Sequence, residues 1–473
     1  MPLNVAIVGA GPSGFYTAAA LLKLVPDVHI DIIEALPSPY GLIRGGVAPD
    51  HQSTKAVARA FERTAGTPQV AYFGNVALGR DVSLDELREI YDAVVLAMGA
   101  PLDRRLDIPG GDKPGAYGAA AFVGWYNGHP DYSDLNPDLN TRSVCVIGNG
   151  NVALDIARVL VKTPREMASS DLPEAVARVI HSAPIRDVYV IGRRGPAEAK
   201  FTNKELSELG ALEACVPVVD AAQLPASVPE EDGLPERERR RREKNLATFR
   251  SFAARRPEDE KDKPRRLHFI FYARPVEVLG GDRVEGLRLE RTRVEGGRAV
   301  GTGETFDIPC GLIVSAIGYR MPAIAGLPID PDTGVIRNSD GRVEKGVYTV
   351  GWARRGPTGV IGTNKSDGDI VARHIVEDVG QGGKPGRAAL EALLREHGVR
   401  WVSFADWQRI DAAEVAAAPP GAPRRKLIRI KDMLNILDKD DAAAAASAPG
   451  AVPGDTASGS GDTERADPSV TQS

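Results

Sequence analysis

The arginine pair Arg193 and Arg194 follows the apolar run VYVI at residues 188–191 after a single glycine. An earlier run, VHIDIIE, ends instead in the acid Glu34. A carboxylate in that place accepts hydrogen bonds from a ribose diol, whereas paired guanidinium groups bind the dianion of a 2′-phosphate. The two positions predict that one chain binds two nucleotides, the first without a 2′-phosphate and the second, of the NADP type, with one. The alternative for each position is an ordinary solvated charge at the end of a strand.

Glycine-rich turns precede both positions and join an apolar run to a helix-like run. In the first turn Gly9, Gly11 and Gly14 have the spacing G-x-G-x-x-G, and the second turn begins at Gly148 and reads GNGNVA. This spacing is weak evidence by itself in a chain with 50 glycines. Between a strand and a helix, however, such a turn brings backbone N–H groups and the positive helix end onto a pyrophosphate. We therefore expect FAD or NAD at the first turn and NADP at the second.

The order of these patterns predicts an α/β protein with two Rossmann-like dinucleotide-binding domains, the NADP domain being inserted in the FAD domain. Each unit is closed by a buried-type run that ends in a glycine turn, at residues 91–101 and again at residues 310–320. One site of each kind implies a flavoprotein oxidoreductase that transfers a hydride from NADPH to the flavin. The expected boundaries are 1–103 and 323–439 for the FAD domain with its C-terminal extension, 104–322 for the NADP domain, and 440–473 for a low-complexity, disordered tail.

The composition limits the partners and surroundings of the protein. A net charge of −5 argues against non-specific nucleic-acid binding, which needs a basic excess. The three cysteines form no C-x-x-C pair, which excludes a thioredoxin-type dithiol and fits a reducing compartment, and no metal site is expected. The chain reaches a strand-like run by residue 4 and has no long apolar stretch. We therefore expect no signal peptide, no membrane contact and a cytoplasmic location.

Several stretches together resemble the adrenodoxin reductase family of ferredoxin–NADP reductases, which have a glutathione-reductase-like fold. The resemblance covers about residues 3–440 and depends on VAIVGAGPSGFY, PYGLIRGGVAPDH, VIGNGNVALDIAR, VIGRRGPAEAKFTNKEL and VGWARRGPTGVIGTNKSDG. It implies an FAD enzyme that takes a hydride from NADPH and passes single electrons to a ferredoxin-type iron–sulfur protein. It also implies a monomer.

The resemblance implies a set of cofactor contacts in addition to the glycines of the first turn. For FAD these are Ser13, Glu34 and Leu42 at one end, and Trp352, Gly359, Val360 and Ile361 at the other, with Val82 as a further contact. For NADP they are Asn149, Gly150, Asn151, Val152, Arg193, Arg194 and Glu205. The last glycine-rich loop precedes a helix expected to begin near Asn364, so its N–H groups would face the flavin and favour the reduced, anionic ring.

His51 and Glu205 match family positions near the flavin and nicotinamide rings and are the catalytic candidates. Each also has a structural interpretation. A lone histidine is often an ordinary polar residue, and Thr202 with Glu205 has the spacing of a helix capping box. Neither residue needs to act as an acid or a base, because hydride transfer moves no separate proton.

An arginine-rich run lies near the segment whose basic residues dock an acidic ferredoxin in the family. It contains Arg237, Arg239, Arg240, Arg241 and Arg242. A dense cationic patch on an acidic protein would steer such a partner, while the alternative is a solvated helix with Glu–Arg pairs. Other functions considered are a flavin subunit resembling the small chain of glutamate synthase, a flavin monooxygenase and a non-catalytic NADP(H)-binding redox sensor. The first is disfavoured because the N-terminus lacks cysteine clusters.

Overall fold

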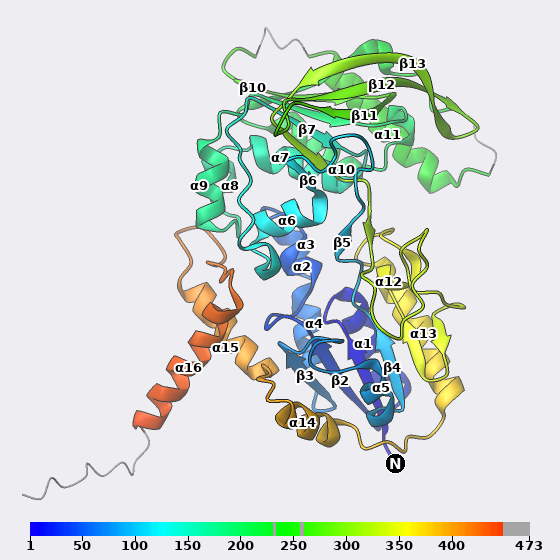
Figure 1. The fold of residues 1–473 in the computed structure, drawn as a ribbon, viewed down its shortest axis with the longest axis vertical. Coiled ribbons are helices and arrows are strands. Elements are labelled where there is room, and N and C mark those ends of the chain that lie inside the picture. Colours follow the sequence, from blue (N-terminus) through cyan, green and yellow to red (C-terminus); the bar gives the residue numbers. More distant parts are fainter. Residues whose placement is uncertain (230–232, 256–259, 448–473) are drawn as a thin grey trace, which may run out of the picture.

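Within residues 1–229, 233–255 and 260–447, which the computed structural model describes, two six-stranded sheets form the framework, one in each half of the molecule (Figure 1). The first sheet has the order β16-β17-β4-β1-β2-β3, and its neighbours are parallel except β16 and β17. Its strands are β1 Leu3–Val8, β2 Val28–Glu34, β3 Val70–Gly74, β4 Ala93–Leu96, β16 Arg342–Glu344 and β17 Val347–Thr349.

The second sheet has the order β6-β14-β7-β8-β10-β9, and all of its neighbours are parallel. Its strands are β6 Ala116–Gly118, β7 Ser143–Ile147, β8 Asp187–Ile191, β9 Cys215–Val219, β10 Arg265–Ile270 and β14 Leu312–Ser315. All of them lie in the sequence between β4 and β16, so the second unit is inserted in the first. The expected fold class, an α/β protein with one nucleotide-binding unit inserted in another, is confirmed.

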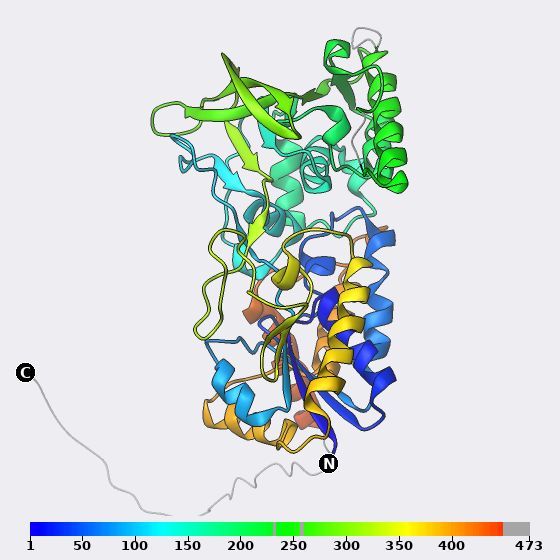
Figure 2. The same cartoon turned by 90° about the vertical axis from the view of Figure 1, so that its right-hand side faces the viewer.

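Helices cover the sheets because the central strands are nearly continuous apolar runs with both faces buried. Every residue of β1 is buried. In the first unit α1 (Pro12–Leu24) packs against α13 (Thr363–Val379), and both run beside the sheet in Figure 2. The other helices of this unit are α2 Leu42–Gly45, α3 Gln52–Lys55, α4 Ala58–Ala65, α5 Leu84–Ile90 and α12 Trp352–Arg355.

The inserted unit carries its own helices around the second sheet. They are α6 Ala119–Asn127, α7 Asn151–Val161, α8 Pro164–Met167, α9 Glu174–Ser182, α10 Asn203–Glu208 and α11 Glu236–Ala253. Short 3-10 turns lie at Pro130–Tyr132, Pro196–Glu198, Leu209–Ala211 and Ala221–Gln223. The arginine-rich run therefore forms part of a helix, α11.

A third sheet extends the inserted unit. It is antiparallel and consists of β11 (Ala273–Leu279), β12 (Gly286–Glu295) and β13 (Arg298–Pro309). Figure 2 shows this sheet on one side of the unit and α11 on the other. The sequence analysis did not predict it.

Two short strands lie where the chain passes between the units. These strands, β5 (Leu102–Asp103) and β15 (Tyr319–Arg320), pair with each other antiparallel. The predicted domain boundaries after residues 103 and 322 fall beside this ladder, and they stay a prediction.

The C-terminal part of the first unit is helical. It contains α14 (Arg387–Glu396), α15 (Phe404–Ala416) and α16 (Ile430–Ser447). The predicted disorder from residue 440 is corrected for residues 440–447, because they continue α16; the rest of the predicted tail, 448–473, lies outside the described residues. Within the described ranges, the helices are too short or too polar to cross a membrane.

Candidate functional site

The first glycine turn opens α1 with two glycines packed against protein and one that faces open space. Gly9 has a φ of 113°, and a Cβ on it would lie 2.5 Å from the carbonyl oxygen of Ala97. A Cβ on Gly14 would overlap the carbonyl oxygen of Gly9, whereas a Cβ on Gly11 would meet nothing within 4 Å. Tight packing at two positions and open approach at the third fit a pyrophosphate at the N-terminus of α1.

Glu34, at the end of β2, and Leu42, at the start of α2, lie close to this turn. The Ala10 N–H donates to Oε2 of Glu34 at 2.8 Å. Burial raises the pKa of the Glu34 carboxyl, and the hydrogen bond from Ala10 opposes that rise. A Cβ on Gly41 would lie 3.1 Å from the Cα of Gly11, so the segment before Leu42 approaches the turn closely. The structure therefore brings together Glu34, Leu42 and Gly11, which are all expected to contact FAD.

The loop that enters α12 contacts the start of α1. A Cβ on Gly351 would lie 2.7 Å from the Cβ of Ser13. The indole N–H of Trp352 donates to the carbonyl oxygen of Thr358 at 3.2 Å. The indole also stacks on the ring of Tyr319, with the centroids 5.5 Å apart. Ser13 and Trp352, expected at opposite ends of FAD, thus lie on neighbouring segments.

The loop of Gly359, Val360 and Ile361 leads into α13, which begins at Thr363, one residue before the expected start. The side chain of Val360 is 62% exposed. Among the described residues, no acceptor is found for the N–H groups of Ile361 and Gly362. Unpaired donors at a helix N-terminus stabilise negative charge, so this loop fits the electron-rich edge of a flavin.

The second glycine turn repeats the geometry of the first. Gly148 has a φ of 151°, and a Cβ on it would lie 2.6 Å from the carbonyl oxygen of Ala316. A Cβ on Gly150 would meet nothing within 4 Å, and Ala153 is completely buried. The turn therefore has the same close packing at its first and third positions, and the same open space between them.

The arginine loop, residues 192–194, lies beside this second turn. A Cβ on Gly192 would overlap the side chain of Asn149, which occupies that space. The loop continues β8, and neither Arg193 nor Arg194 has a carboxylate partner in the part of the chain that the structure describes. Two guanidinium groups with no internal counter-charge are therefore placed next to a pyrophosphate-type turn, as binding of a 2′-phosphate requires.

Asn151 and Val152 are the first residues of α7, and the amide of Asn151 links that helix to α10. The Thr202 N–H donates to Oδ1 of Asn151 at 2.8 Å, and Nδ2 of Asn151 donates to Oε2 of Glu205 at 3.1 Å. Val152 is partly buried against the core of the inserted unit. Thr202 is the N-cap of α10 but makes no side-chain capping bond. The capping-box interpretation of Glu205 is therefore wrong, because its carboxylate reaches Asn151 instead.

The surroundings of Glu205 favour the protonated form of its carboxyl group. Burial, and then the charge of Asp155, raises its pKa above the ordinary value. The imidazole of the other catalytic candidate, His51, faces Glu208 instead, with its Nε2 3.3 Å from Oε2 of that residue. Glu205 and Glu208 are three residues apart on α10, and residues at that spacing are neighbours on a helix surface. This spacing could have identified Glu208 from the sequence as a second acid near the site.

A buried arginine connects this group of residues. The guanidinium of Arg158, in α7, lies 3.5 Å from Nδ1 of His51 and 3.7 Å from Oε2 of Glu208. It also pairs with Asp155 at 2.7 Å and with Asp50. No sequence pattern pointed to Arg158, because its partners come from three separate segments.

The chain is similar to known proteins over most of its length. The pyridine nucleotide-disulphide oxidoreductase family matches residues 3–208. Human mitochondrial NADPH:adrenodoxin oxidoreductase is 42% identical over 455 residues, which cover 92% of this chain and 92% of the relative. The NADPH-ferredoxin reductase FprA of Mycobacterium tuberculosis is 40% identical over 459 residues, which cover 92% and 99%. The structure of that FprA in complex with NADPH matches with a TM-score of 0.86 at 39% identity, again covering 92% and 99%.

The chain belongs to the adrenodoxin reductase family. The resemblance inferred from the sequence is therefore confirmed, and the chain is an oxidoreductase. Each glycine turn follows the carboxyl end of a central strand, β1 or β7, which is where nucleotides bind in open α/β sheets.

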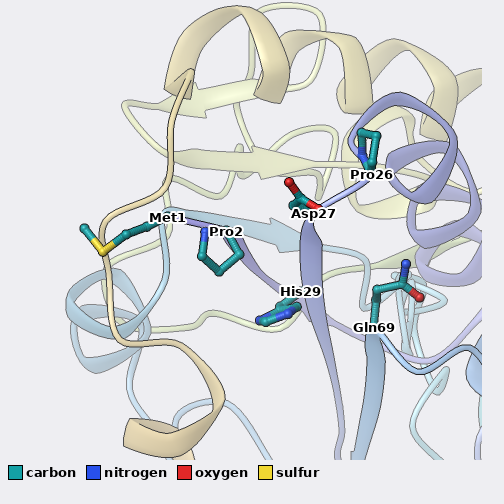
Figure 3. Close-up of a pocket in the computed structure, with 6 residues that line it drawn as sticks. All are labelled: Met1, Pro2, Pro26, Asp27, His29 and Gln69. Carbon is teal, nitrogen blue, oxygen red and sulfur yellow. The ribbon is translucent and has the colours of Figure 1, made fainter.

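Two features of this adrenodoxin reductase family member lie away from the turns. Val82, an expected FAD contact, is 2% exposed in the core of the first unit, and its role stays a prediction. A surface pocket, drawn in Figure 3, lies beside the amino ends of β1, β2 and β3, opposite to the glycine turn. It is lined by Met1, Pro2, Pro26, Asp27, His29 and Gln69. Its position excludes it as part of the nucleotide site.

Proposed function

We propose that this protein is an FAD-containing NADPH:ferredoxin oxidoreductase. The observation that carries the proposal is the pair of equivalent glycine turns, each open at its middle glycine, with Glu34 beside one and Arg193 and Arg194 beside the other. When bound, FAD supplies the redox chemistry, because it accepts a hydride from NADPH and releases electrons one at a time.

The residues of the chain position the two nucleotides. Gly9, Gly11 and Gly14 allow the pyrophosphate of FAD to approach α1, and Glu34 accepts its ribose. Asn151 and Glu205, joined by a hydrogen bond of 3.1 Å, orient the nicotinamide end of NADPH. A fixed orientation lowers the barrier to hydride transfer because the reactants do not have to lose that freedom at the transition state.

The electron acceptor is a ferredoxin-type iron–sulfur protein that docks on the arginines of α11. Arg240 is 71% exposed, and its Nε donates to Oε1 of the similarly exposed Glu236 at 2.7 Å. Arg237 is exposed and Arg239 is half-buried. Arg241 has an internal role, because its Nη1 donates to the carbonyl oxygens of Ala199 and Phe201. Arg242 is mostly buried and pairs with Glu238. Steering of an acidic partner therefore falls to Arg237, Arg239 and Arg240.

We also propose that the protein works as a monomer in the cytoplasm. Cys145, Cys215 and Cys310 are buried free thiols, which fits a reducing compartment such as the cytoplasm.

An absorbance titration of the purified protein tests the function. The protein should be yellow, NADPH should bleach the flavin band much faster than NADH, and adding a ferredoxin should restore the band through repeated turnovers. A colourless preparation, or equal rates with both nucleotides, would overturn the proposal. Bleaching that is not followed by turnover with any iron–sulfur acceptor would instead favour a redox sensor.

A further inference from the structure

The arginine loop is held from behind by the turn that joins β10 to β11. The N–H of Ala273 donates to the carbonyl oxygen of Gly192 at 3.1 Å, and the N–H of Tyr272 donates to that of Arg194 at 3.2 Å. In contrast, the backbone N–H groups of Arg193 and Arg194 have no acceptor among the described residues. The carbonyl oxygens of Gly192 and Arg194 are therefore bonded to protein, while the N–H groups of the loop are left to bind an anion.

The middle carbonyl of the loop is held by a side chain from the three-stranded sheet. Oγ1 of Thr292, in β12, donates to the carbonyl oxygen of Arg193 at 2.8 Å. Thr292 is only 6% exposed, and its own N–H donates to the carbonyl oxygen of Tyr272 at 2.8 Å. The pairing of β12 with β13 shifts register between Glu290 and Thr292, and such a bulge redirects the side chains next to it.

The turn that supplies these donors is itself tightly constrained. Tyr272 has a φ of 52°, in the left-handed region that non-glycine residues rarely adopt. A Cβ on Gly195 would overlap the hydroxyl group of Tyr272, so that side chain lies directly against the end of the arginine loop. An unfavourable backbone conformation of this kind persists only where surrounding contacts hold it in place. One such contact here is the hydrogen bond from the Thr292 N–H to the carbonyl oxygen of Tyr272.

We propose that Thr292 is a positioning residue for the 2′-phosphate of NADP(H), and that the sheet of β11, β12 and β13 is the brace that makes the arginine loop selective for NADP(H) over NAD(H). The proposal rests on the proposed use of NADPH and names the part of the fold that determines nucleotide choice. Without the Thr292 hydroxyl, the Arg193 carbonyl loses its partner and turns toward solvent, where its dipole opposes the 2′-phosphate. The loss should be specific to that phosphate, because the Thr292 hydroxyl donates to the carbonyl oxygen of Arg193 in the arginine loop.

The test uses the FAD-loaded enzyme and two probes that differ in one phosphate, adenosine 2′,5′-bisphosphate and adenosine 5′-monophosphate. Thr292→Val removes the donor and keeps the shape of the side chain. It should weaken calorimetric binding of the bisphosphate about 5-fold, as expected for loss of one hydrogen bond, and leave the monophosphate unchanged. Thr292→Ser should restore binding. The kcat at saturating NADPH and the FAD content should stay near those of the parent.

A matched control lies in the same sheet. Oγ1 of Thr302, in β13, donates to the carbonyl oxygen of Arg291 at 3.0 Å, and this hydrogen bond is exposed to solvent. Thr302→Val therefore removes the same kind of bond without touching the arginine loop, and binding of both probes should be unchanged. Adding Thr292→Val to Arg193→Ala should cause little further loss, because both changes act through one loop.

Three results would overturn the role of Thr292: unchanged binding of the bisphosphate, equal weakening of both probes, or an equal effect of Thr302→Val. If Thr292→Val does not fold, Gly195→Ala displaces Tyr272 and must give the same selective loss, or the proposal fails. A parent enzyme that binds both probes equally would refute the proposed use of NADPH, which is a separate outcome.

Discussion

The guanidinium of Arg158, in α7 of the inserted unit, is ion-paired with the carboxylate of Asp50, in the loop before α3 of the first unit. Arg158 is 1% exposed, and Nζ of Lys162 lies 2.6 Å from the same Asp50 oxygen. Burial alone would raise the pKa of Asp50, but the charges of Arg158 and Lys162 hold it below its ordinary value. Charges shielded from water therefore join the two units.

Arg158→Met should lower the free energy of unfolding by about 3–5 kcal/mol, because it leaves Asp155 without its arginine partner and leaves the buried Asp50 with Lys162 alone. Urea denaturation measures the loss. Arg165→Met is the control: Arg165 pairs with Glu213 but is 82% exposed, so solvent screens the pair and its loss should cost much less stability. Similar losses in the two variants would contradict this account of the unit junction.

Glu414→Gln should reduce stability in a pH-dependent way. Burial alone would raise the pKa of Glu414, but Arg44, with help from the Leu427 N–H, holds it below the ordinary value of 4.5. The ionised carboxylate therefore stabilises the fold above about pH 4.5, and this contribution disappears as the pH falls through the lower folded pKa. We expect Glu414→Gln to cost about 3 kcal/mol at pH 7 and progressively less in acid. Urea denaturation at several pH values checks this; a constant difference, or the same loss in the exposed control Glu304→Gln, would contradict it.

Gly11→Val should give a folded protein without FAD. A side chain at Gly11 meets no protein atom within 4 Å, but it would fill the space that the pyrophosphate needs. The ratio of flavin to protein absorbance should fall by about 10-fold or more while the circular dichroism spectrum is unchanged. Gly383→Val, also in open space but away from the turn, should keep its flavin. Full flavin content in Gly11→Val would show that the first turn does not hold FAD.

His51→Ala and Glu205→Ala should each slow flavin reduction by NADPH about 10-fold, with little change in FAD content. The reason is orientation: Glu205 holds Asn151 of the second glycine turn, and His51 contacts Glu208 on the same helix, α10. Stopped-flow absorbance measures the rate. Ser207→Ala, on α10 but exposed, should have no effect. Unchanged reduction rates in both variants would leave His51 and Glu205 with a purely structural role.

Reversing Arg239 and Arg240 to Glu should lower ferredoxin-linked turnover about 10-fold at low salt and flatten its dependence on ionic strength. Reduction of a small dye should survive. Arg241 is left intact because its guanidinium holds the carbonyl oxygens of Ala199 and Phe201. Arg293→Glu, on the three-stranded sheet across the unit from α11, is the matched charge reversal. Docking on α11 would be rejected if ferredoxin turnover and its salt response did not change.

Sequence patterns identified the features whose determinants are local. The glycines of each turn, the strand before it and the helix after it lie within about 25 residues, so their spacing alone predicts the backbone shape and the place of a pyrophosphate. The contrast of Glu34 with Arg193 and Arg194 is equally local, because one charge at one strand end decides which ribose can approach. The inserted topology followed from seeing the pattern twice, with a closing run after each copy.

Only the tertiary structure decided which side chains support that framework. Arg158 meets Asp50 across 108 positions, Thr292 meets the Arg193 carbonyl across 99, and Asn151 reaches Glu205 across 54. A local pattern carries no information about such contacts, and at Glu205 it predicted a capping box that the fold replaces with the bond to Asn151. The sequence by itself determined which nucleotides the chain is built to bind. Folding decided how those sites are joined and braced, because buried charges and donors select their partners by distance in space and not by distance along the chain.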